Sequence, residues 1–363
     1  MSDQIGIRAT FMRGGTSKGL FLRWEDVPED RDAFLIAAIG AGDPYGRLLD
    51  GMGGGVSSLS KAMMVRRSDR AGVDIDYLFA QAAIREAHMD YAANCGNLSS
   101  AVGCYAVDQG LVQLPDGPGV VRMFNENTSK RIDCQLTVRG GRAAVTGDQE
   151  IAGVPGTGSP IRLDFHDPGG AGTGSLLPLG APVVEVDGVG VSFVDAANPC
   201  VFVRAEDLGV TANLLPADLA ANAELMARLE HLRASAGEKA GMPAAPGAPK
   251  IALVSSPDSF ETLTGQTLPA QACDVLVRMI SMGAPHLAIP LTGAMAVGVA
   301  ARISGTVVNN AARPVAGDAP LRIGTASGIV PAMAEVTEEP HAIKASIYRT
   351  ARTLMEGTVY AEL

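Results

Sequence analysis

The sequence predicts a turn-rich α+β protein with two domains, and three observations support this. The chain has 363 residues, more than one ordinary domain, and 47% of them are apolar, so it can bury two hydrophobic cores. Its 43 glycines and 22 prolines favour many turns between short strands over long helices. Two polar turns, at residues 92–103 and 290–301, each lead into an apolar helical segment and carry Ala-Val-Gly at matching positions. This indicates an internal duplication, with a chance match as the alternative.

Hydrophobic periodicity and helix breakers predict the elements of the first half. Strands are expected at 5–10 and 20–22, on either side of a glycine-rich loop, and a helix at Arg31–Ile39 that ends in the breaker-rich residues 40–46. Further strands are expected at 62–65, 73–84, 120–125 and 132–138, with a helix at 98–109. The stretch 153–174, rich in Gly, Pro, Ser and Thr, is expected to be a loop, and the domain boundary is placed just after it.

The second half is expected to start with strands and to contain two helices. Strands are expected at 182–186, 189–194, 199–203, 251–254 and 275–282. A helix is expected over Pro216–Ala234, followed by an exposed loop rich in Gly, Pro and Ala at 237–249. The second polar turn then leads into a helix within 290–301.

Charge and composition favour a small-molecule partner. The net charge of −10 argues against a nucleic-acid or anionic-membrane surface, because both need clustered Lys and Arg. No leader pattern or long apolar run is visible, so a soluble, cytoplasmic protein is expected. The five cysteines are scattered without C-x-x-C, and the five histidines form no metal-binding motif. The sequence therefore suggests neither a disulfide framework nor a metal.

The chain is organised around the stretch Ala92–Gly103, where Cys95 would lie at the start of a helix. Unpaired N–H groups and the positive end of the helix dipole stabilise an anion there, so a thiol ionises more easily and a carboxylate is held more easily. Cys95 is therefore a candidate acid, base or nucleophile. The alternative is a buried structural cysteine, with Asn94 serving only as a helix cap.

Two glycine-rich loops precede this turn. The first, Met12–Gly19, combines glycines, hydroxyls and the cations Arg13 and Lys18, the composition of a backbone pocket for a carboxylate, although an ordinary hairpin turn has it too. The second, Asp50–Lys61, ends where an apolar strand begins, so Lys61 can be desolvated. Burial disfavours the ammonium form and makes a lysine more useful for proton abstraction, whereas a lysine that points to solvent is the alternative.

Short motifs in a specific order carry a family resemblance along nearly the whole chain. They are Met12–Gly19, Asp43–Gly46, Asp50–Gly54, Ser60-Lys61, Asn94–Ser99, Asn198-Pro199, Ser281–Gly283, Thr292–Ala294 and Arg349–Gly357. Cys-Gly-Asn before one helix, Asn-Pro at a strand start and Thr-Gly-Ala before a second helix resemble the diaminopimelate-epimerase-like fold. The full set resembles the PrpF family, whose members include 2-methylaconitate cis-trans isomerase, methylitaconate Δ-isomerase and 4-oxalomesaconate tautomerase.

The resemblance implies two pseudo-symmetric domains, each a mostly antiparallel, β-barrel-like sheet wrapped around a central helix. With it we expect residues 1–178 plus 345–363 in the first domain and 179–344 in the second. It also implies a site in the cleft between them and no cofactor, whereas the formation of a homodimer stays open. Epimerases of this fold use one cysteine per domain. Here the second position falls at Pro290, which counts against an amino-acid racemase.

The resemblance also implies the site residues. Lys61 and Cys95 match the acid/base pair of the family, and which of them takes the proton stays open. The positions implied to bind substrate are Arg13, Gly14, Gly15, Thr16, Ser17, Lys18, Ser60, Asn94, Gly96, Asn97, Leu98, Asn198, Arg278, Ser281, Met282, Thr292, Gly293 and Ala294.

A lysine/cysteine pair suits the isomerisation of an unsaturated acid. One group removes an allylic proton, and the other returns a proton elsewhere on the dienolate-like conjugate base. We expect an unsaturated di- or tricarboxylate of the aconitate type, because Asp43–Gly46 and Cys95–Ser100 look more like that branch. The alternatives are a 4-oxalomesaconate tautomerase or allylic Δ-isomerase and, from another class, a non-catalytic accessory factor for an aconitase-like dehydratase.

Overall fold

The computed structural model describes residues 3–91, 94–242, 245, 247–316 and 319–362. The chain forms two compact units, unit 1 (Met1–Asp164 and Tyr348–Leu363) and unit 2 (Phe165–Ile347). The boundaries expected from the sequence were 178/179 and 344/345. The residues after 165 belong to unit 2 because the N–H groups of Gly172 and Thr173 donate to the Asp195 carboxylate at 2.8 and 2.7 Å.

Unit 1 consists mainly of strands. Its helices are α1 (Arg31–Ile39) and α2 (Gly96–Asp108), with the short 3₁₀ helices η1 (Trp24–Asp26) and η2 (Ser57–Leu59). Its strands are β1 (Ile5–Gly14), β2 (Ser17–Arg23), β3 (Lys61–Arg67), β4 (Ile75–Ala82), β5 (Met89–Asp90), β6 (Gly117–Asn125), β7 (Lys130–Arg139), β8 (Arg142–Ala143), β9 (Gln149–Ile151), β10 (Val154–Gly158) and β23 (Ala351–Ala361). The chain passes between the units within β11 (Ile161–His166) and β22 (Ala342–Arg349).

Unit 2 has more helices. They are α3 (Pro216–Ala221), α4 (Ala223–Lys239), α5 (Leu291–Ala300) and α6 (Val307–Ala311), with η3 (Ala205–Leu208) and η4 (Ala270–Ala272). Its strands are β12 (Val184–Val186), β13 (Val189–Asp195), β14 (Pro199–Arg204), β15 (Lys250–Ser255), β16 (Phe260–Glu261), β17 (Thr267–Leu268), β18 (Val275–Ser281), β19 (Ala284–Pro285), β20 (Leu321–Thr325) and β21 (Gly328–Val336).

Three predictions of secondary structure were wrong, in whole or in part. The expected loop 153–174 contains β10 and β11, and along β11 the apolar Ile161, Leu163 and Phe165 alternate with polar residues, as in a strand. The expected helix 216–234 is two helices, since the Asn222 side chain accepts the Leu225 N–H at 3.1 Å and so begins α4. Helix α4 also continues to Lys239, into the expected loop 237–249. Residues 243, 244 and 246 of that loop lie outside the described residues.

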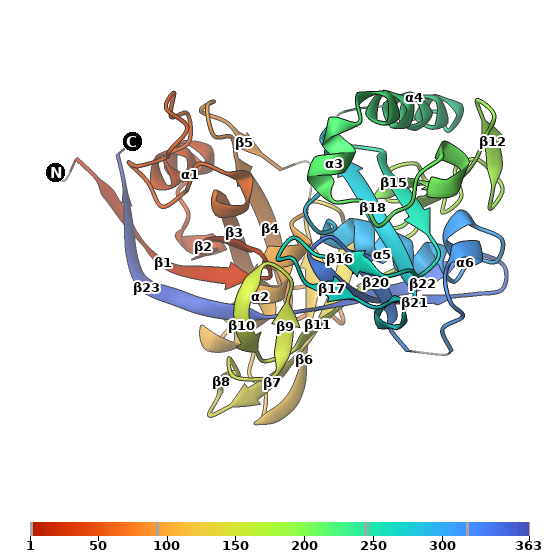
Figure 1. The fold of residues 1–363 in the computed structure, drawn as a ribbon. Coiled ribbons are helices and arrows are strands. Elements are labelled where there is room, and N and C mark those ends of the chain that lie inside the picture. The colour runs from red at the N-terminus through yellow and green to blue at the C-terminus, as the bar shows by residue number, and fades with distance from the viewer. Residues whose placement is uncertain (1–2, 92–93, 243–244, 246, 317–318, 363) are drawn as a thin grey trace. The chain divides into compact units, whose positions relative to one another are not determined.

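The two units repeat one strand pattern. In unit 1, β1 pairs antiparallel with β2, β2 parallel with β3, β3 antiparallel with β4, β4 parallel with β6, and β6 antiparallel with β7. In unit 2, β13, β14, β15, β18, β20 and β21 follow the same order with the same senses. This confirms the expected pseudo-symmetric α+β fold. Strand β23, blue in Figure 1, runs antiparallel beside β1.

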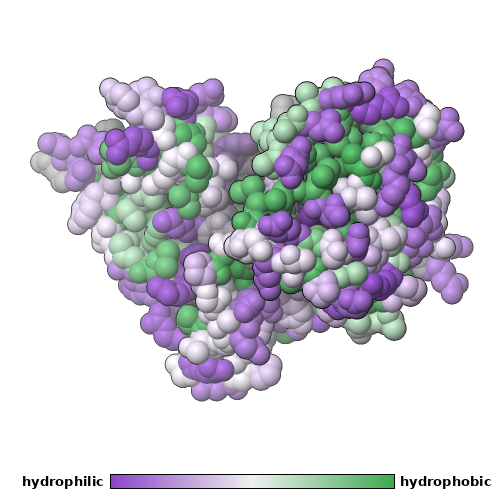
Figure 2. Space-filling view, viewed as in Figure 1, coloured by the Kyte–Doolittle hydropathy of each residue, from purple (hydrophilic) through white to green (hydrophobic). Residues whose placement is uncertain are grey.

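A buried helix lies against the sheet of each unit. Helix α2 contacts β1, β2, β3, β6 and β7, and its residues Leu98–Val107 are all buried. Helix α5 is the counterpart in unit 2, where it contacts β13, β14 and β21. A second helix covers another part of each core. Phe34 and Leu35 of α1 are fully buried in unit 1, whereas α4 buries Leu229 and Leu232 and presents a hydrophilic outer face (Figure 2).

Candidate active site

The β1–β2 hairpin packs directly on the first turn of α2. A Cβ on Gly14 would lie 2.6 Å from the Asn97 carbonyl oxygen, and one on Gly15 would lie 2.2 Å from Asn97 Oδ1. Gly15 also has a φ of +51°, a conformation that side chains disfavour. The two glycines of the predicted loop are therefore required by close packing, and the hairpin fixes the position of the helix start.

Two arginines hold this contact together. Arg349 Nε donates to Asn97 Oδ1 at 3.0 Å, and the same oxygen accepts the Thr16 N–H at 3.5 Å. Arg13 donates to the carbonyl oxygens of Gly15 and Thr350 at 2.9 and 3.0 Å. Burial lowers the pKa of Arg13, with a smaller effect from the neighbouring Arg352. Arg13, Thr16 and Asn97, which were predicted to bind substrate, therefore make contacts that position the helix.

Cys95 lies at the N-cap of α2, immediately before the helix, as predicted. Its side chain is half-buried, is not in a disulfide and makes no capping hydrogen bond. The Cys95 thiol lies 3.9 Å from Ser17 Oγ, the first residue of β2. Arg349 is near enough to interact electrostatically with Cys95, while burial lowers the pKa of Arg349 to about 10. The guanidinium therefore stays charged at neutral pH, and Cys95 has a hydroxyl group, a cation and a helix N-terminus around it.

A buried polar cluster supports the residue before Cys95. Asn94 Oδ1 accepts from Asn125 Nδ2 at 3.1 Å and from Ser99 Oγ at 3.2 Å. The Tyr77 hydroxyl lies 2.9 Å from Ser99 Oγ, and burial raises the Tyr77 pKa, so this hydroxyl stays neutral. Asn94 is thus fixed by side chains from β4, β6 and α2, and the backbone leading to Cys95 is fixed with it.

Lys61 is buried, with 8% of its surface exposed, at the first position of β3. Its Nζ donates to Oε1 of Gln81, the residue opposite it on β4, and lies 5.1 Å from the centre of the Phe79 ring. Gln81 is itself held, because its Nε2 donates to the carbonyl oxygens of Ser60 and Ala82 at 2.9 and 3.1 Å. The ammonium therefore has a neutral partner and forms no ion pair within the part of the chain that is described.

Strand β2 borders both candidate catalytic residues. A Cβ on Gly19 would lie 2.3 Å from the Lys61 carbonyl oxygen, so only a glycine lets β3 approach here. Ser17 and Gly19 are two residues apart on one strand and therefore share a face. Strand β2 thus carries Ser17, which lies beside the Cys95 thiol, and Gly19, which lies beside the backbone of Lys61.

The remaining predicted residues of unit 1 have local roles. Ser60 is buried and its hydroxyl donates to the Gly54 carbonyl oxygen, which closes the glycine-rich loop before β3. Lys18 lies over the Phe11 ring, 5.7 Å from its centre. Gly96 and Leu98 are buried in the first turn of α2. Residues 92 and 93 of the stretch around Cys95 lie outside the described residues.

The predicted residues of unit 2 fall into separate groups. Ser281 accepts a hydrogen bond from Lys250 Nζ at 3.1 Å, and Met282 next to it is 69% exposed. Arg278 is an odd number of positions from Ser281 on β18, so it faces the other side of the sheet. It donates to backbone carbonyl oxygens there, those of Leu214 and Val277 among them, and burial lowers its pKa to about 10.

Other predicted residues of unit 2 lie at its hairpin and at α5. Asn198, in the turn before β14, has a buried Oδ1 with no partner among the described residues. Thr292, Gly293 and Ala294 form the first turn of α5 after the N-cap Pro290, and a Cβ on Gly293 would lie 2.5 Å from Met279 Sδ. Pro290 thus occupies in unit 2 the place that Cys95 occupies in unit 1.

Several contributing residues have no local signal in the sequence. Tyr77 and Gln81 lie on β4 and contact Asn94 and Lys61 only because of strand pairing and helix packing. Alternation along β4 places Tyr77, Phe79 and Gln81 on one face of the strand. The polar Gln81 near the end of this face was the one sign in the sequence that the face meets a polar partner. Arg349 lay within a resemblance motif, but no role followed from it.

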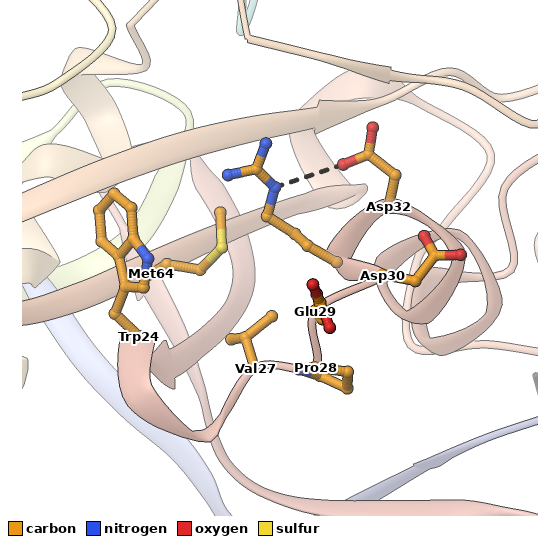
Figure 3. A pocket seen from close by; sticks show the side chains of 8 residues that line it. Trp24, Val27, Pro28, Glu29, Asp30, Asp32 and Met64 are labelled. Carbon is orange, nitrogen blue, oxygen red and sulfur yellow. Dashed lines mark hydrogen bonds and ion pairs between the residues drawn. The ribbon is translucent and has the colours of Figure 1, made fainter.

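A cavity of about 550 Å³ lies elsewhere on unit 1 (Figure 3). Trp24, Met64 and the segment 27–32 line it. Figure 3 labels Glu29, Asp30 and Asp32 along it, and three carboxylates against the single guanidinium of Arg31 do not suit a polyanionic ligand. Among the described residues, no three His, Cys, Asp or Glu side chains are grouped so that they could hold a metal ion. In the same part of the chain no helix combines the length and apolarity of a membrane span.

Comparison with characterised proteins gives consistent relatives over the full length. The chain is 38% identical over 379 residues to the 3-methylitaconate isomerase of Eubacterium barkeri, covering all of this chain and 99% of that one. It is 38% identical to the 2-methyl-aconitate isomerase of Shewanella oneidensis, covering 98% and 97% of the two chains. It is 37% identical to the (4E)-oxalomesaconate Delta-isomerase of Novosphingobium sp. (strain KA1), covering 96% of each.

Solved structures agree with this. A crystal structure of methylitaconate-delta-isomerase superposes with a TM-score of 0.93 at 38% identity, covering 99% of this chain and 97% of that one. A hydroxyproline epimerase from Agrobacterium vitis superposes with a TM-score of 0.52 at 12% identity, covering 99% and 93%, which shows a shared fold. The family model of the PrpF protein matches residues 4–362. With relatives named as isomerases across its whole length, the chain is an isomerase that belongs to the PrpF family.

Proposed function

We propose that this isomerase acts on an unsaturated di- or tricarboxylate of the aconitate type, with Lys61 and Cys95 as the two groups that move protons and without a cofactor. One observation carries the proposal. A buried lysine without an ion pair among the described residues begins the strand beside β2, and a free, half-buried cysteine at a helix N-terminus lies 3.9 Å from Ser17 of β2. An ammonium and a thiol can each donate a proton, and an amine and a thiolate can each accept one.

The proposed reaction is a proton transfer in two balanced halves. One of the two groups takes a proton from the carbon next to the double bond, and the C–H electron pair passes into a dienolate stabilised by the carboxylates. The other group donates a proton at the far carbon, or at the same carbon after rotation, so that the double bond moves or changes geometry. The group that faces the allylic hydrogen of the bound substrate is the one that removes the proton.

The negative charge of the intermediate needs preorganised donors. The first N–H groups of α2, at Gly96 and Asn97, belong to the helix-terminal donors that have no partner within the helix, and the Cys95 side chain does not cap them. Arg349 Nη2 makes no hydrogen bond to the described residues, whereas Nε and Nη1 are used by Asn97 and Tyr348. We propose that Arg349 Nη2 and these N–H groups stabilise the developing charge. The sequence-based expectation that residues of unit 2 also bind the substrate stays a prediction.

The relatives narrow the candidate substrates to three unsaturated acids but do not rank them. Two of the relatives are named for methylitaconate and methylaconitate and one for oxalomesaconate, at similar identity. The motif Asp43–Gly46 favoured the aconitate branch in the sequence. In the structure, the Asp43 carboxylate accepts the N–H groups of Tyr45, Arg47 and Leu48 at 2.7–2.9 Å, which holds its pKa below the usual range and closes its own loop. An assay must therefore choose the substrate.

The test is a panel of 2-methylaconitate, 3-methylitaconate and (4E)-oxalomesaconate in deuterium oxide, followed by proton NMR. We expect the highest kcat/KM with an aconitate-type acid, and deuterium at the carbon that receives the proton. A kcat/KM at least tenfold higher for oxalomesaconate would assign the chain to the alternative branch. Consumption of none of the three acids would overturn the proposal.

A further inference from the structure

Lys61 and Gln81 face each other at one end of the β3–β4 pair, and the partner of the lysine there is an amide. Lys61 is the first residue of β3, Gln81 lies opposite it on β4, and Lys61 Nζ donates to Gln81 Oε1. Towards the other end of the same pair, Arg66 lies opposite Asp76, and its Nε is 3.4 Å from the Asp76 carboxylate. The two strands therefore give one cation a carboxylate partner and the other an uncharged one.

The backbone around Gln81 fixes the direction of its amide. Gln81 Nε2 donates to the carbonyl oxygens of Ser57, Ser60 and Ala82 at 3.2, 2.9 and 3.1 Å. The opposite orientation of the amide would place its oxygen against these three carbonyl oxygens and its NH2 group against the Lys61 ammonium. Gln81 therefore presents an acceptor to Lys61, and the contacts of its Nε2 hold that acceptor in place.

The other groups that face Lys61 from the neighbouring strands are uncharged too. Phe79 shares the face of β4 with Gln81, and the centre of its ring lies 5.1 Å from Lys61 Nζ. Strand β2 contributes Gly19, which has no side chain, beside the Lys61 backbone. Lys61 is 8% exposed, so little water replaces these contacts. Because an adjacent anion would favour the ammonium form, its absence from these contacts leaves the amine form accessible.

We propose that Gln81 keeps Lys61 able to exchange its proton, because it places an uncharged acceptor where a carboxylate would hold the ammonium. This rests on the proposed function, in which Lys61 moves a proton. An ammonium and a neutral amine both carry N–H groups, so Lys61 can donate to Gln81 Oε1 before and after the transfer. A carboxylate at this position would form a charge-assisted hydrogen bond with the ammonium. That bond would deplete the amine that accepts a proton and oppose the release of a proton by the ammonium.

The experiment compares Gln81→Glu with Gln81→Leu. Both variants lose the amide N–H groups that bind the three carbonyl oxygens, and only Gln81→Glu adds a charge beside Lys61. Gln113→Glu makes the same chemical change at an exposed residue in the segment after α2 and serves as the matched control. Thermal unfolding would show that each variant is folded. Gln81→Asp, whose carboxylate is one methylene shorter, replaces Gln81→Glu if the latter is not.

The protonation of Lys61 can be measured without any substrate. The carbon-13 NMR signal of its Cε, assigned by its absence in Lys61→Met, would be followed through a pH titration. We expect the equilibrium between amine and ammonium to favour the ammonium about tenfold to a hundredfold more in Gln81→Glu than in Gln81→Leu, the value of a charge-assisted hydrogen bond. Gln113→Glu should titrate like the wild type. The same titration midpoint in the two Gln81 variants would overturn the proposal.

Turnover separates this proposal from the proposed function. At saturating concentrations of the preferred acid, Gln81→Glu should have a kcat about tenfold to a hundredfold below that of Gln81→Leu, and Gln113→Glu should keep the wild-type kcat. A purely structural glutamine predicts the reverse order, because glutamate keeps a hydrogen bond to Lys61 and leucine does not.

Equal kcat values in the two Gln81 variants of an active enzyme would reject the role of Gln81 and leave the isomerase assignment intact. A titration of Lys61 that shifts as expected, in a protein that consumes none of the three acids, would reject the proposed function. It would still support the effect of Gln81 on the protonation of Lys61.

Discussion

Asn97 Oδ1 accepts a hydrogen bond from Arg349 Nε at 3.0 Å, although 252 residues separate them in the chain. Arg349 ends β22 and Asn97 lies in the first turn of α2, so the last part of the chain fixes the helix start that carries Cys95. The following strand, β23, pairs with β1 along ten residues of that strand, Ile5 to Gly14. The helix start is therefore held by the last part of the chain, through Arg349 at the end of β22, as well as by the glycine-rich hairpin.

The first prediction concerns Arg349. Arg349→Lys should lower kcat/KM by roughly tenfold to a hundredfold, because the compact ammonium lacks the planar fork with which the guanidinium holds Asn97 through Nε and directs Nη2 elsewhere. Steady-state kinetics on the preferred acid would measure this, with Arg352→Lys, an exposed residue on β23, as the control. Wild-type kinetics in Arg349→Lys would show that its donors are not used in the reaction.

Features that depend on local sequence could be predicted. Helix α1 begins and ends as expected, because Asp30 accepts the Ala33 N–H at 3.2 Å at its start and Gly40 adopts a φ of +80° at its end. The placement of Cys95 immediately before a helix followed from the change from a polar turn to an apolar segment. The correspondence of Pro290 with Cys95 followed from the same pattern in the second half.

Features that depend on long-range contacts could not be predicted. Gln81 contacts Lys61 through strand register, and Asn125 contacts Asn94 through the packing of β6 against α2. The role of Arg13 was also hidden, because a cation in a glycine-rich loop looks the same whether it binds a ligand or, as here, the Thr350 carbonyl oxygen. The high Gly, Pro, Ser and Thr content of residues 153–174 predicted a loop, but it comes from the turns around β10 and β11 and hides the two strands.

The second prediction tests the close approach of β2 and β3. Gly19→Ala should lower the free energy of unfolding by about 1–3 kcal/mol, as overpacking does, because its Cβ would overlap the Lys61 carbonyl oxygen. It should also lower kcat, since Lys61 must shift. Gly357→Ala is the control, because a Cβ on this exposed strand glycine meets nothing within 4 Å. Denaturant unfolding and kinetics of both variants decide it, and an unchanged kcat in a destabilised Gly19→Ala would separate packing from catalysis.

The third prediction concerns Cys95. Cys95→Ser should leave stability nearly unchanged, because the side chain is half-buried and caps no helix N–H. It should lower turnover by roughly 10²–10⁴, the usual loss for an acid/base group. Cys104→Ser, a buried cysteine in the middle of α2, is the control, and it should reduce stability more than turnover. Normal turnover in Cys95→Ser would make this cysteine structural.

The fourth prediction concerns metals. Turnover should survive exhaustive chelation, because the described residues bring no three potential ligands together and the proposed proton transfer needs none. Activity with the preferred acid would be followed before and after dialysis against a chelator. Loss of activity that a divalent ion restores would reveal a metal site and contradict the prediction.

The last prediction concerns Lys61, which is buried and whose role in proton transfer an experiment can separate from a structural one. Lys61→Met should remain folded, because the apolar chain fills the buried space beside Phe79. It should still lose about 1–3 kcal/mol of stability, since Gln81 Oε1 then has no donor. If Lys61 carries a proton, exchange of the allylic hydrogens in deuterium oxide should fall by roughly 10²–10⁴ even at saturating substrate.

Gln81→Leu separates the effect of losing the Lys61–Gln81 hydrogen bond from the effect of losing the ammonium, which a measurement of stability alone cannot do. It breaks the same hydrogen bond but keeps the ammonium, so a purely structural lysine predicts equal losses of exchange in the two variants. A proton-carrying lysine predicts that Gln81→Leu keeps most of its exchange and that Lys61→Met keeps almost none. Proton NMR of the allylic and vinyl signals would follow both variants with the same acid. Wild-type label incorporation in Lys61→Met would reject Lys61, and Cys95 would then need another partner on the face of β2 that Ser17 and Gly19 share.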